Sequence, residues 1–113
     1  MIRIVALHRY PSDPEAYEAY YRETHMPLVE RVPGVHKVRV GKVVGTPSGD
    51  EPGYWLMSEV YFEGAAELEN AMRSPEMRAA MDDVPNFAVE GQVTIMYCDT
   101  EDIVVNGSPR AAI

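Results

Sequence analysis

The order of strand-like and helix-like segments is the feature that most constrains the fold of this chain. β-Branched and aromatic runs bounded by Gly and Pro predict strands, and apolar positions three and four residues apart predict helices. The predicted strands cover residues 2–8, 35–45, 54–62 and 89–98. The predicted helices cover residues 14–31 and 64–73, and a second short helix starts after Ser74. This βαββαβ order predicts a ferredoxin-like α+β fold, in which a four-stranded antiparallel sheet carries the helices on one face.

The first predicted helix has clear signals at both ends. Asp13 can cap the free N–H groups, Pro14 suits the first turn, and Pro33 with Gly34 ends the helix. Helical spacing places the following side chains on one face: Tyr17, Tyr20, Tyr21, Thr24, His25 and Leu28. We expect this face to contact the sheet.

Both faces of the predicted sheet carry large apolar side chains. In residues 54–62, alternation places Trp55, Met57, Glu59 and Tyr61 on one side and Tyr54, Leu56, Val60 and Phe62 on the other. The helices can cover only one face, and a stable monomer rarely exposes so large an apolar patch. We therefore expect a homodimer in which two sheets pack face to face and nearly close into a barrel.

Charge and composition narrow the classes of partner. The chain has 113 residues, enough for one domain, and a net charge of −8. Residues 1–50 carry seven basic and six acidic side chains, whereas residues 51–113 carry three and twelve. Without a basic stripe we expect no nucleic acid and no anionic membrane surface as a partner. A small neutral or apolar ligand, or another protein, fits this charge.

The sequence also indicates a cellular compartment. No apolar run approaches the roughly 20 residues of a membrane helix, and the N-terminus lacks a signal-peptide pattern. Cys98 is the single cysteine, so an intramolecular disulfide and a multi-cysteine metal site are excluded. We expect a cytoplasmic protein.

Residues 8–38, HRYPSDPEAYEAYYRETHMPLVERVPGVHKV, resemble the EthD family of the dimeric α+β barrel superfamily. The shared pattern is a helix ending in His-x-Pro-Leu followed by Pro-Gly. The matching positions here are His25, Pro27, Leu28, Pro33 and Gly34. SPEMRAAMDDVPNF is similar to the second-helix region of the family. The resemblance covers residues 1–98 as one domain and leaves residues 99–113 as a tail.

The resemblance implies a fold and a dimer, and it suggests several chemistries. Related barrels include cofactor-free dehydratases, cyclases and isomerases that act on aromatic or polyketide-like rings, and haem-degrading monooxygenases. We expect a hydrophobic or aromatic metabolite in a cleft between helix and sheet, with cofactor-free lyase or isomerase chemistry if the protein is an enzyme. One alternative is a non-catalytic ligand-binding or accessory protein. Another is a haem-binding monooxygenase, which the acidic second half does not favour.

His25 is the first candidate catalytic residue, and two interpretations of it stay open. Its unperturbed pKa near 6.5 suits an acid or base. Alternatively, its ring satisfies a backbone carbonyl. Pro27 has no N–H for the carbonyl of Glu23 and pushes Met26 away from helical angles, so a carbonyl there lacks its usual partner.

Glu59 and Tyr21 complete the predicted catalytic group. If the face of Glu59 lines a cavity, desolvation would raise its pKa; otherwise it pairs with Lys37 or Arg39 on the neighbouring strand. The predicted ligand-binding residues are His8, Tyr17, Trp55, Met57 and Tyr61. The histidines lack His-x-His or His-x-x-x-His spacing, so we expect no metal. With the cofactor-free chemistry expected above, we also expect no cofactor.

Overall fold

The computed structural model describes residues 1–106, 108 and 109. Its main strands are β1 (Ile2–His8), β2 (Lys37–Lys42), β3 (Leu56–Phe62) and β4 (Val93–Asp99). Its helices are α1 (Pro14–Tyr20), η1 (Tyr21–His25), α2 (Met26–Glu30), α3 (Ala65–Met72), α4 (Pro75–Asp83) and η2 (Val84–Asn86). After β4, the short strands β5 (Val104–Val105) and β6 (Ser108–Pro109) pair with each other. None of the helices described here is long and apolar enough to cross a membrane.

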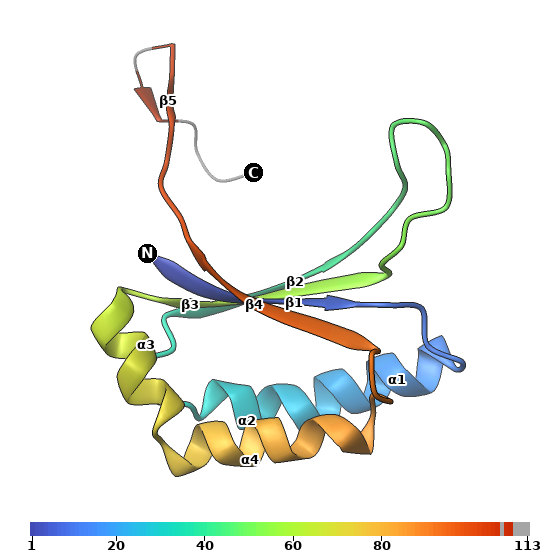
Figure 1. Cartoon of the computed structure of the whole chain (residues 1–113), viewed down its shortest axis with the longest axis horizontal. Coiled ribbons are helices and arrows are strands. Elements are labelled where there is room, and N and C mark those ends of the chain that lie inside the picture. Colours follow the sequence, from blue (N-terminus) through green and yellow to red (C-terminus); the bar gives the residue numbers. More distant parts are fainter. Residues whose placement is uncertain (107, 110–113) are drawn as a thin grey trace.

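The main sheet has the ferredoxin-like arrangement predicted from the sequence. Its strand order is β2-β3-β1-β4, and every neighbouring pair is antiparallel. The register places Ala6 in β1 opposite Ser58 in β3 and Ile95 in β4. Figure 1 shows the helices on one side of this sheet. The loop between β2 and β3 and the segment after β4 extend like two arms beyond the other side, which we call the open face.

The helical run from Pro14 to Glu30 is continuous but changes its winding. Asp13 caps it as predicted, its Oδ1 accepting a hydrogen bond from the Ala16 N–H at 3.2 Å. Before Pro27 the helix widens into a π-helical turn, in which the Met26 N–H donates to the Tyr21 carbonyl five residues back. The expectation that Pro27 pushes Met26 out of helical angles is wrong, because Met26 has φ −58° and ψ −41°. The wider turn accommodates the proline instead.

Two hydrophobic clusters fill the space between helices and sheet. In the larger cluster, Leu56 of β3 packs with side chains of the first helical run. In the smaller cluster, Phe62 packs with Leu68 of α3 and Met77 of α4. Leu56 and Phe62 are fully buried, so the side of β3 that carries them is the helix-facing side.

Two details of the predicted strands are wrong. Trp55 does not share a face with Met57; it lies in a bend before β3 and its ring packs edge-on against Tyr17, at a centroid distance of 5.6 Å. Residues 89–92 form a turn closed by a hydrogen bond from the Gln92 N–H to the Val89 carbonyl, and Gly91 adopts φ +81° within it. Glycine allows that angle without steric cost, so β4 starts only at Val93.

Candidate active site

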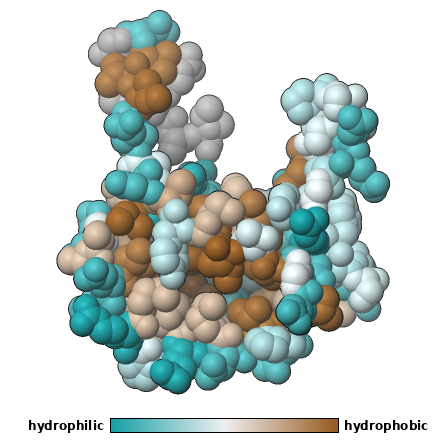
Figure 2. Space-filling model, viewed as in Figure 1, coloured by the Kyte–Doolittle hydropathy of each residue, from teal (hydrophilic) through white to brown (hydrophobic). Residues whose placement is uncertain are grey.

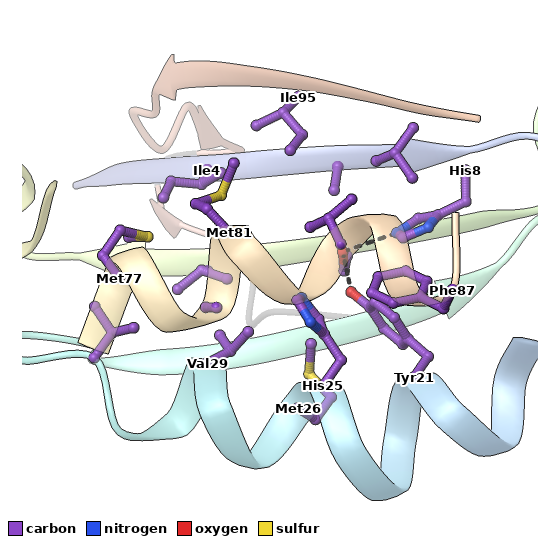
Figure 3. Close-up of a pocket in the computed structure, with 17 residues that line it drawn as sticks. Ile4, His8, Tyr21, His25, Met26, Val29, Met77, Met81, Phe87 and Ile95 are labelled. Carbon is purple, nitrogen blue, oxygen red and sulfur yellow. Dashed lines mark hydrogen bonds between the residues drawn. The ribbon is translucent and has the colours of Figure 1, made fainter. Parts of the chain in front are cut away.

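A partly enclosed cavity of about 70 Å³ lies between the sheet and the helices. In Figure 2, which has the same orientation as Figure 1, hydrophobic side chains gather between the sheet and the helices. The polar side chains in the cavity wall are His8, Tyr21, His25 and Ser58 (Figure 3). Much of the remaining wall comes from Ile4, Val29, Val60, Met77, Met81 and Ile95. The cavity therefore combines a hydrophobic volume with a few directed polar groups, as small-molecule sites do.

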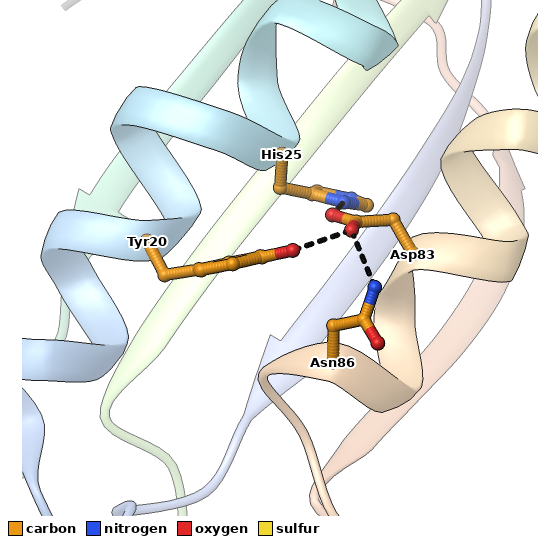
Figure 4. A network of polar contacts seen from close by, with 4 residues as sticks. All are labelled: Tyr20, His25, Asp83 and Asn86. Atoms are coloured by element: carbon orange, nitrogen blue, oxygen red, sulfur yellow. Dashed lines mark hydrogen bonds and ion pairs between the residues drawn. The ribbon is translucent and has the colours of Figure 1, made fainter.

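His25 is held against the cavity by a carboxylate from α4. Its Nδ1 lies 3.0 Å from Oδ2 of Asp83, and both side chains are buried. The other carboxylate oxygen accepts hydrogen bonds from the Tyr20 hydroxyl at 2.6 Å and from Asn86 Nδ2 at 3.0 Å (Figure 4). Because Nδ1 is hydrogen-bonded to Asp83, Nε2 is the nitrogen of His25 that can form a hydrogen bond with a ligand.

The protonation states of this pair follow from its surroundings. Burial alone would raise the pKa of the Asp83 carboxyl, but hydrogen bonds from Tyr20, Asn86 and His25 outweigh it and lower that pKa. Burial lowers the pKa of His25, and Asp83 offsets only part of that shift. At neutral pH the pair is therefore an ionised carboxylate beside a neutral imidazole. An ionised carboxylate only accepts hydrogen bonds, so His25 donates Nδ1–H and its Nε2 is a free base.

A second polar cluster lies on the β1 side of the cavity. His8 Nδ1 lies 2.6 Å from the Tyr17 hydroxyl, and His8 Nε2 lies 3.3 Å from Ser58 Oγ. The Tyr21 hydroxyl donates to the same Ser58 oxygen at 2.6 Å. Burial, with a smaller contribution from His25, lowers the pKa of His8 to about 4. His8 is therefore neutral at cellular pH and acts as a hydrogen-bonding group.

The π-helical turn brings the two clusters together. It spans Tyr21–His25, and the rings of these two residues stack with centroids 5.4 Å apart. Turns of this kind are rare and occur frequently at functional sites. Here the irregular segment begins and ends at cavity-lining residues, so the local distortion of the helix coincides with the site.

Among the sequence-predicted residues, the structure brings His25, Tyr21 and His8 together in the cavity wall. The Tyr17 hydroxyl is hydrogen-bonded to His8, and the ring of Trp55 packs against the ring of Tyr17. The ring of His25 contacts a carboxylate, so the proposed bond to a loosened carbonyl is not the arrangement found.

Glu59 does not belong to this site. In β3 the helix-facing positions include Leu56 and Ser58, so Glu59 lies on the open face with Met57 and Tyr61. There it is buried in an ion pair with Arg3 of β1 and accepts a hydrogen bond from the Tyr61 hydroxyl at 2.9 Å. The structure therefore does not bring His25 and Glu59 into one site, because the sheet separates them. Glu59 does form a cross-strand ion pair, and the partner shown is Arg3.

Sequence reasoning missed Asp83 and Ser58. Asp83 is separated from His25 by 58 positions, and the segment that contains it predicts only a helix end. Ser58 alternates with Leu56 on the helix-facing side of the strand, but a lone serine in an apolar strand does not by itself indicate a site. Within the described part of the chain, no group of three or more His, Cys, Asp or Glu side chains could hold a metal ion.

The fold and the cavity define a ferredoxin-like α+β protein with a hydrophobic site between sheet and helices. Residues 9–91 match the model of the EthD domain. The chain belongs to the EthD family, as the resemblance in its first helix suggested.

Related proteins support this assignment. An uncharacterized 11.0 kDa protein from the thcB–thcC intergenic region of Rhodococcus erythropolis is 36% identical over 104 residues, which cover 92% of this chain and 99% of that protein. A crystal structure of an EthD family protein from Bacillus halodurans matches with a TM-score of 0.82 at 33% identity, covering 89% of this chain and 99% of that one.

More distant structures share the fold alone. The hydroxynitrile lyase of Passiflora edulis has a TM-score of 0.71 at 15% identity and covers 92% of this chain and 96% of its own. A dimeric ferredoxin-like protein from Thermobifida fusca has a TM-score of 0.62 at 17% identity and covers 88% of this chain and 90% of its own.

Proposed function

We propose that this EthD-family protein binds a small hydrophobic metabolite in the cavity and catalyses a cofactor-free proton transfer on it. The observation that carries this proposal is the buried His25–Asp83 pair, whose histidine lines an otherwise largely apolar cavity. A buried, perturbed titratable residue in a concave site is typical of an acid–base catalyst. The reaction class that fits is that of a lyase or isomerase.

In this proposal His25 is the catalytic residue and Asp83 is a positioning residue. Asp83 accepts the Nδ1–H, which fixes the tautomer and directs the Nε2 lone pair to the cavity. When Nε2 takes a proton from the substrate, the carboxylate beside it stabilises the imidazolium that forms. His25 then returns the proton to another atom, so no oxidant or cofactor takes part.

The cavity limits the size of the group that reacts. Its volume is about 70 Å³, whereas an apolar cavity of about 150 Å³ binds benzene. The space described accommodates a ligand smaller than benzene or the end of a larger one. Met77 and Met81 lie in the wall, and their flexible side chains can adjust to a longer ligand.

The same proposal includes a homodimer that covers the open face. Apolar side chains there and on the two arms are exposed, among them Met96 on β4, Val44 in the β2–β3 loop and Ile103 after β4. A two-fold pairing of sheets would bury them. Dimeric ferredoxin-like proteins of Thermobifida fusca and a Jannaschia species share this fold and support the arrangement.

Ligand screening of the wild-type protein and His25→Gln tests the catalytic proposal. Compounds that raise the melting temperature of both proteins identify cavity ligands, and mass spectrometry of incubated hits then detects conversion. We expect conversion by the wild type and by His36→Gln, which changes a half-exposed histidine outside the cavity wall. His25→Gln should bind but not convert. Equal conversion by His25→Gln would contradict the role of His25, and binding without conversion by any variant would favour a ligand-binding protein.

A further inference from the structure

The hydroxyl of Ser58 is in an unusual position for a buried serine. It lies in the cavity wall on β3, with 3% of the residue exposed. Two buried groups reach its oxygen: the Tyr21 hydroxyl, which donates at 2.6 Å, and the His8 ring, whose Nε2 lies 3.3 Å away. Ser58 belongs to β3, His8 to β1 and Tyr21 to the first helical run; Figure 3 shows the labelled His8 and Tyr21 in the cavity wall.

The direction of the bond between His8 and Ser58 follows from Tyr17. The Tyr17 side chain is buried, so the proton of its hydroxyl needs an acceptor, and His8 Nδ1 lies 2.6 Å away. The neutral imidazole has one acceptor and one donor nitrogen. If Tyr17 donates to Nδ1, then the proton of His8 is on Nε2, and Nε2–H donates to Ser58.

With these two bonds assigned, the proton of the Ser58 hydroxyl is still without an acceptor. A hydroxyl has two acceptor lone pairs and one donor proton. Tyr21 and His8 occupy both lone pairs, so the Ser58 proton is the group that has to find an acceptor. Because two donors already polarise this oxygen, its O–H is a strengthened donor. The cavity wall thus offers a directed donor on one side and the base His25 on another.

We propose that Ser58, supported by Tyr21 and His8, is a donor site for the carbonyl oxygen of the substrate. The substrate class is then a small aldehyde or ketone with a hydrocarbon body and a hydrogen on the carbon next to the carbonyl. This inference rests on the proposed acid–base function and adds the chemical group that the site recognises. Tyr21 connects the two functions, since its hydroxyl binds Ser58 while its ring stacks on His25.

The reaction step balances without another reagent. Nε2 of His25 removes the proton from the carbon next to the carbonyl, and the electron pair of that C–H bond forms a C=C bond. The π electrons of the C=O bond move to the oxygen, whose negative charge the Ser58 O–H stabilises. A fixed donor aimed at developing charge in a water-poor site is an effective source of catalysis. His25 then returns its proton to the same carbon or to a conjugated one, which completes an exchange or an isomerisation.

Binding of two isosteric probes tests the carbonyl assignment. Cyclobutanone and methylenecyclobutane have the same shape, but only the ketone has an oxygen that accepts a hydrogen bond. We expect the wild-type protein to bind cyclobutanone about tenfold more tightly, the ratio that one well-made hydrogen bond supplies. Ser58→Ala should lose this preference. Equal binding of the two probes by the wild type overturns the carbonyl assignment but leaves the hydrophobic-site proposal standing, whereas binding of neither probe contradicts both.

A second measurement does not depend on how well Ser58→Ala folds. The infrared carbonyl stretch of cyclobutanone bound to the wild-type protein should lie at lower frequency than in an apolar solvent, as hydrogen bonding requires. An unshifted stretch contradicts the donor site. In D₂O the wild type should also exchange the hydrogens next to the carbonyl, and Ser58→Ala should do so about 100-fold more slowly. Exchange that is lost in His25→Gln but unchanged in Ser58→Ala supports the base and overturns the role of Ser58.

Discussion

Nδ1 of His25 donates to Oδ2 of Asp83 over 3.0 Å, joining the first helical run to the last turn of α4. Asp83 also accepts from Tyr20, and the ring of Tyr20 packs against Phe87 with centroids 5.7 Å apart. The same polar contact therefore fixes the ring of His25 and holds two helical segments together. Changes at Asp83 should affect chemistry and stability at once, and the two effects can be separated.

Asp83→Asn should lower the rate of proton transfer by about 100-fold or more, the usual contribution of a correctly protonated acid–base group. The amide can donate to Nδ1, which would favour the tautomer with its proton on Nε2 and remove the base from the cavity. Initial rates with a hit compound, together with histidine nitrogen NMR, measure both effects. Asp82→Asn is the matched control, because Asp82 is the adjacent, exposed residue. Equal losses in the two variants would contradict the positioning role.

The buried His8 predicts how stability depends on pH. Its pKa is about 4 in the folded protein and 6.5 in the reference state, so the unfolded chain binds more protons between these values. Stability should therefore be complete above about pH 6.5 and fall as the pH drops towards 4, by up to about 3 kcal/mol from this residue. The lowered pKa of His25 acts in the same direction.

Urea unfolding across this pH range measures the effect of His8. His8→Gln keeps a side chain that donates and accepts hydrogen bonds but does not titrate there. We expect a less stable variant whose stability changes less between pH 6.5 and 4 than that of the wild type. The carboxylates change the stability of both proteins with pH in the same way. The difference between the two curves of unfolding free energy against pH therefore gives the contribution of His8. Parallel curves would show that His8 is not the group responsible.

Pro27 should determine the widened turn that carries Tyr21 and His25. Proline lacks an N–H, so a regular α-helix through this segment would lose a hydrogen bond. Pro27→Ala restores the donor and removes the ring, and we expect the turn to become α-helical with equal or higher stability. The rings of Tyr21 and His25 should then shift relative to the cavity and activity should fall. Pro14→Ala is the control, because Pro14 lies in the first turn of α1, outside the π-helical segment.

Amide hydrogen exchange and the NMR signals of His25 report the change in the helix. A Pro27→Ala protein that keeps the π-helical turn and full activity would show that side-chain packing, and not proline, determines the winding of this segment.

The sequence predicted the architecture because the signals that define it are local. Asp13 caps the first helix and Pro14 lies in its first turn, as expected for these residue types. The βαββαβ order of elements is then compatible with few sheet topologies. His25, Tyr21 and His8 could be selected because they are polar or aromatic groups on faces expected to be buried. The structure places all three in the cavity wall, but Thr24, expected on the same helix face, is exposed and Met26 and Val29 are buried instead. The catalytic roles stay predictions.

The rest of the site depends on contacts that local patterns do not encode. Asp83 reaches His25 only when α4 packs beside the first helical run. Alternation separates the two faces of a strand without saying which one the helices cover, so the sequence alone does not tell whether Glu59 lies near His25. Its neighbours Leu56 and Ser58 point to the helices, and this leaves Glu59 on the open face.

The open face of the sheet gives the last prediction. Met96 lies on this face of β4 and is 43% exposed, and Met72 on α3 is 40% exposed. If two sheets pack together, Met96→Asp places an unpaired charge in a buried interface and should convert the dimer into monomers. Met72→Asp makes the same chemical change at similar exposure on the helical side and should leave the dimer intact. Light scattering after size-exclusion chromatography measures both masses, and a Met96→Asp protein that stays dimeric would show that the copies pair through another surface.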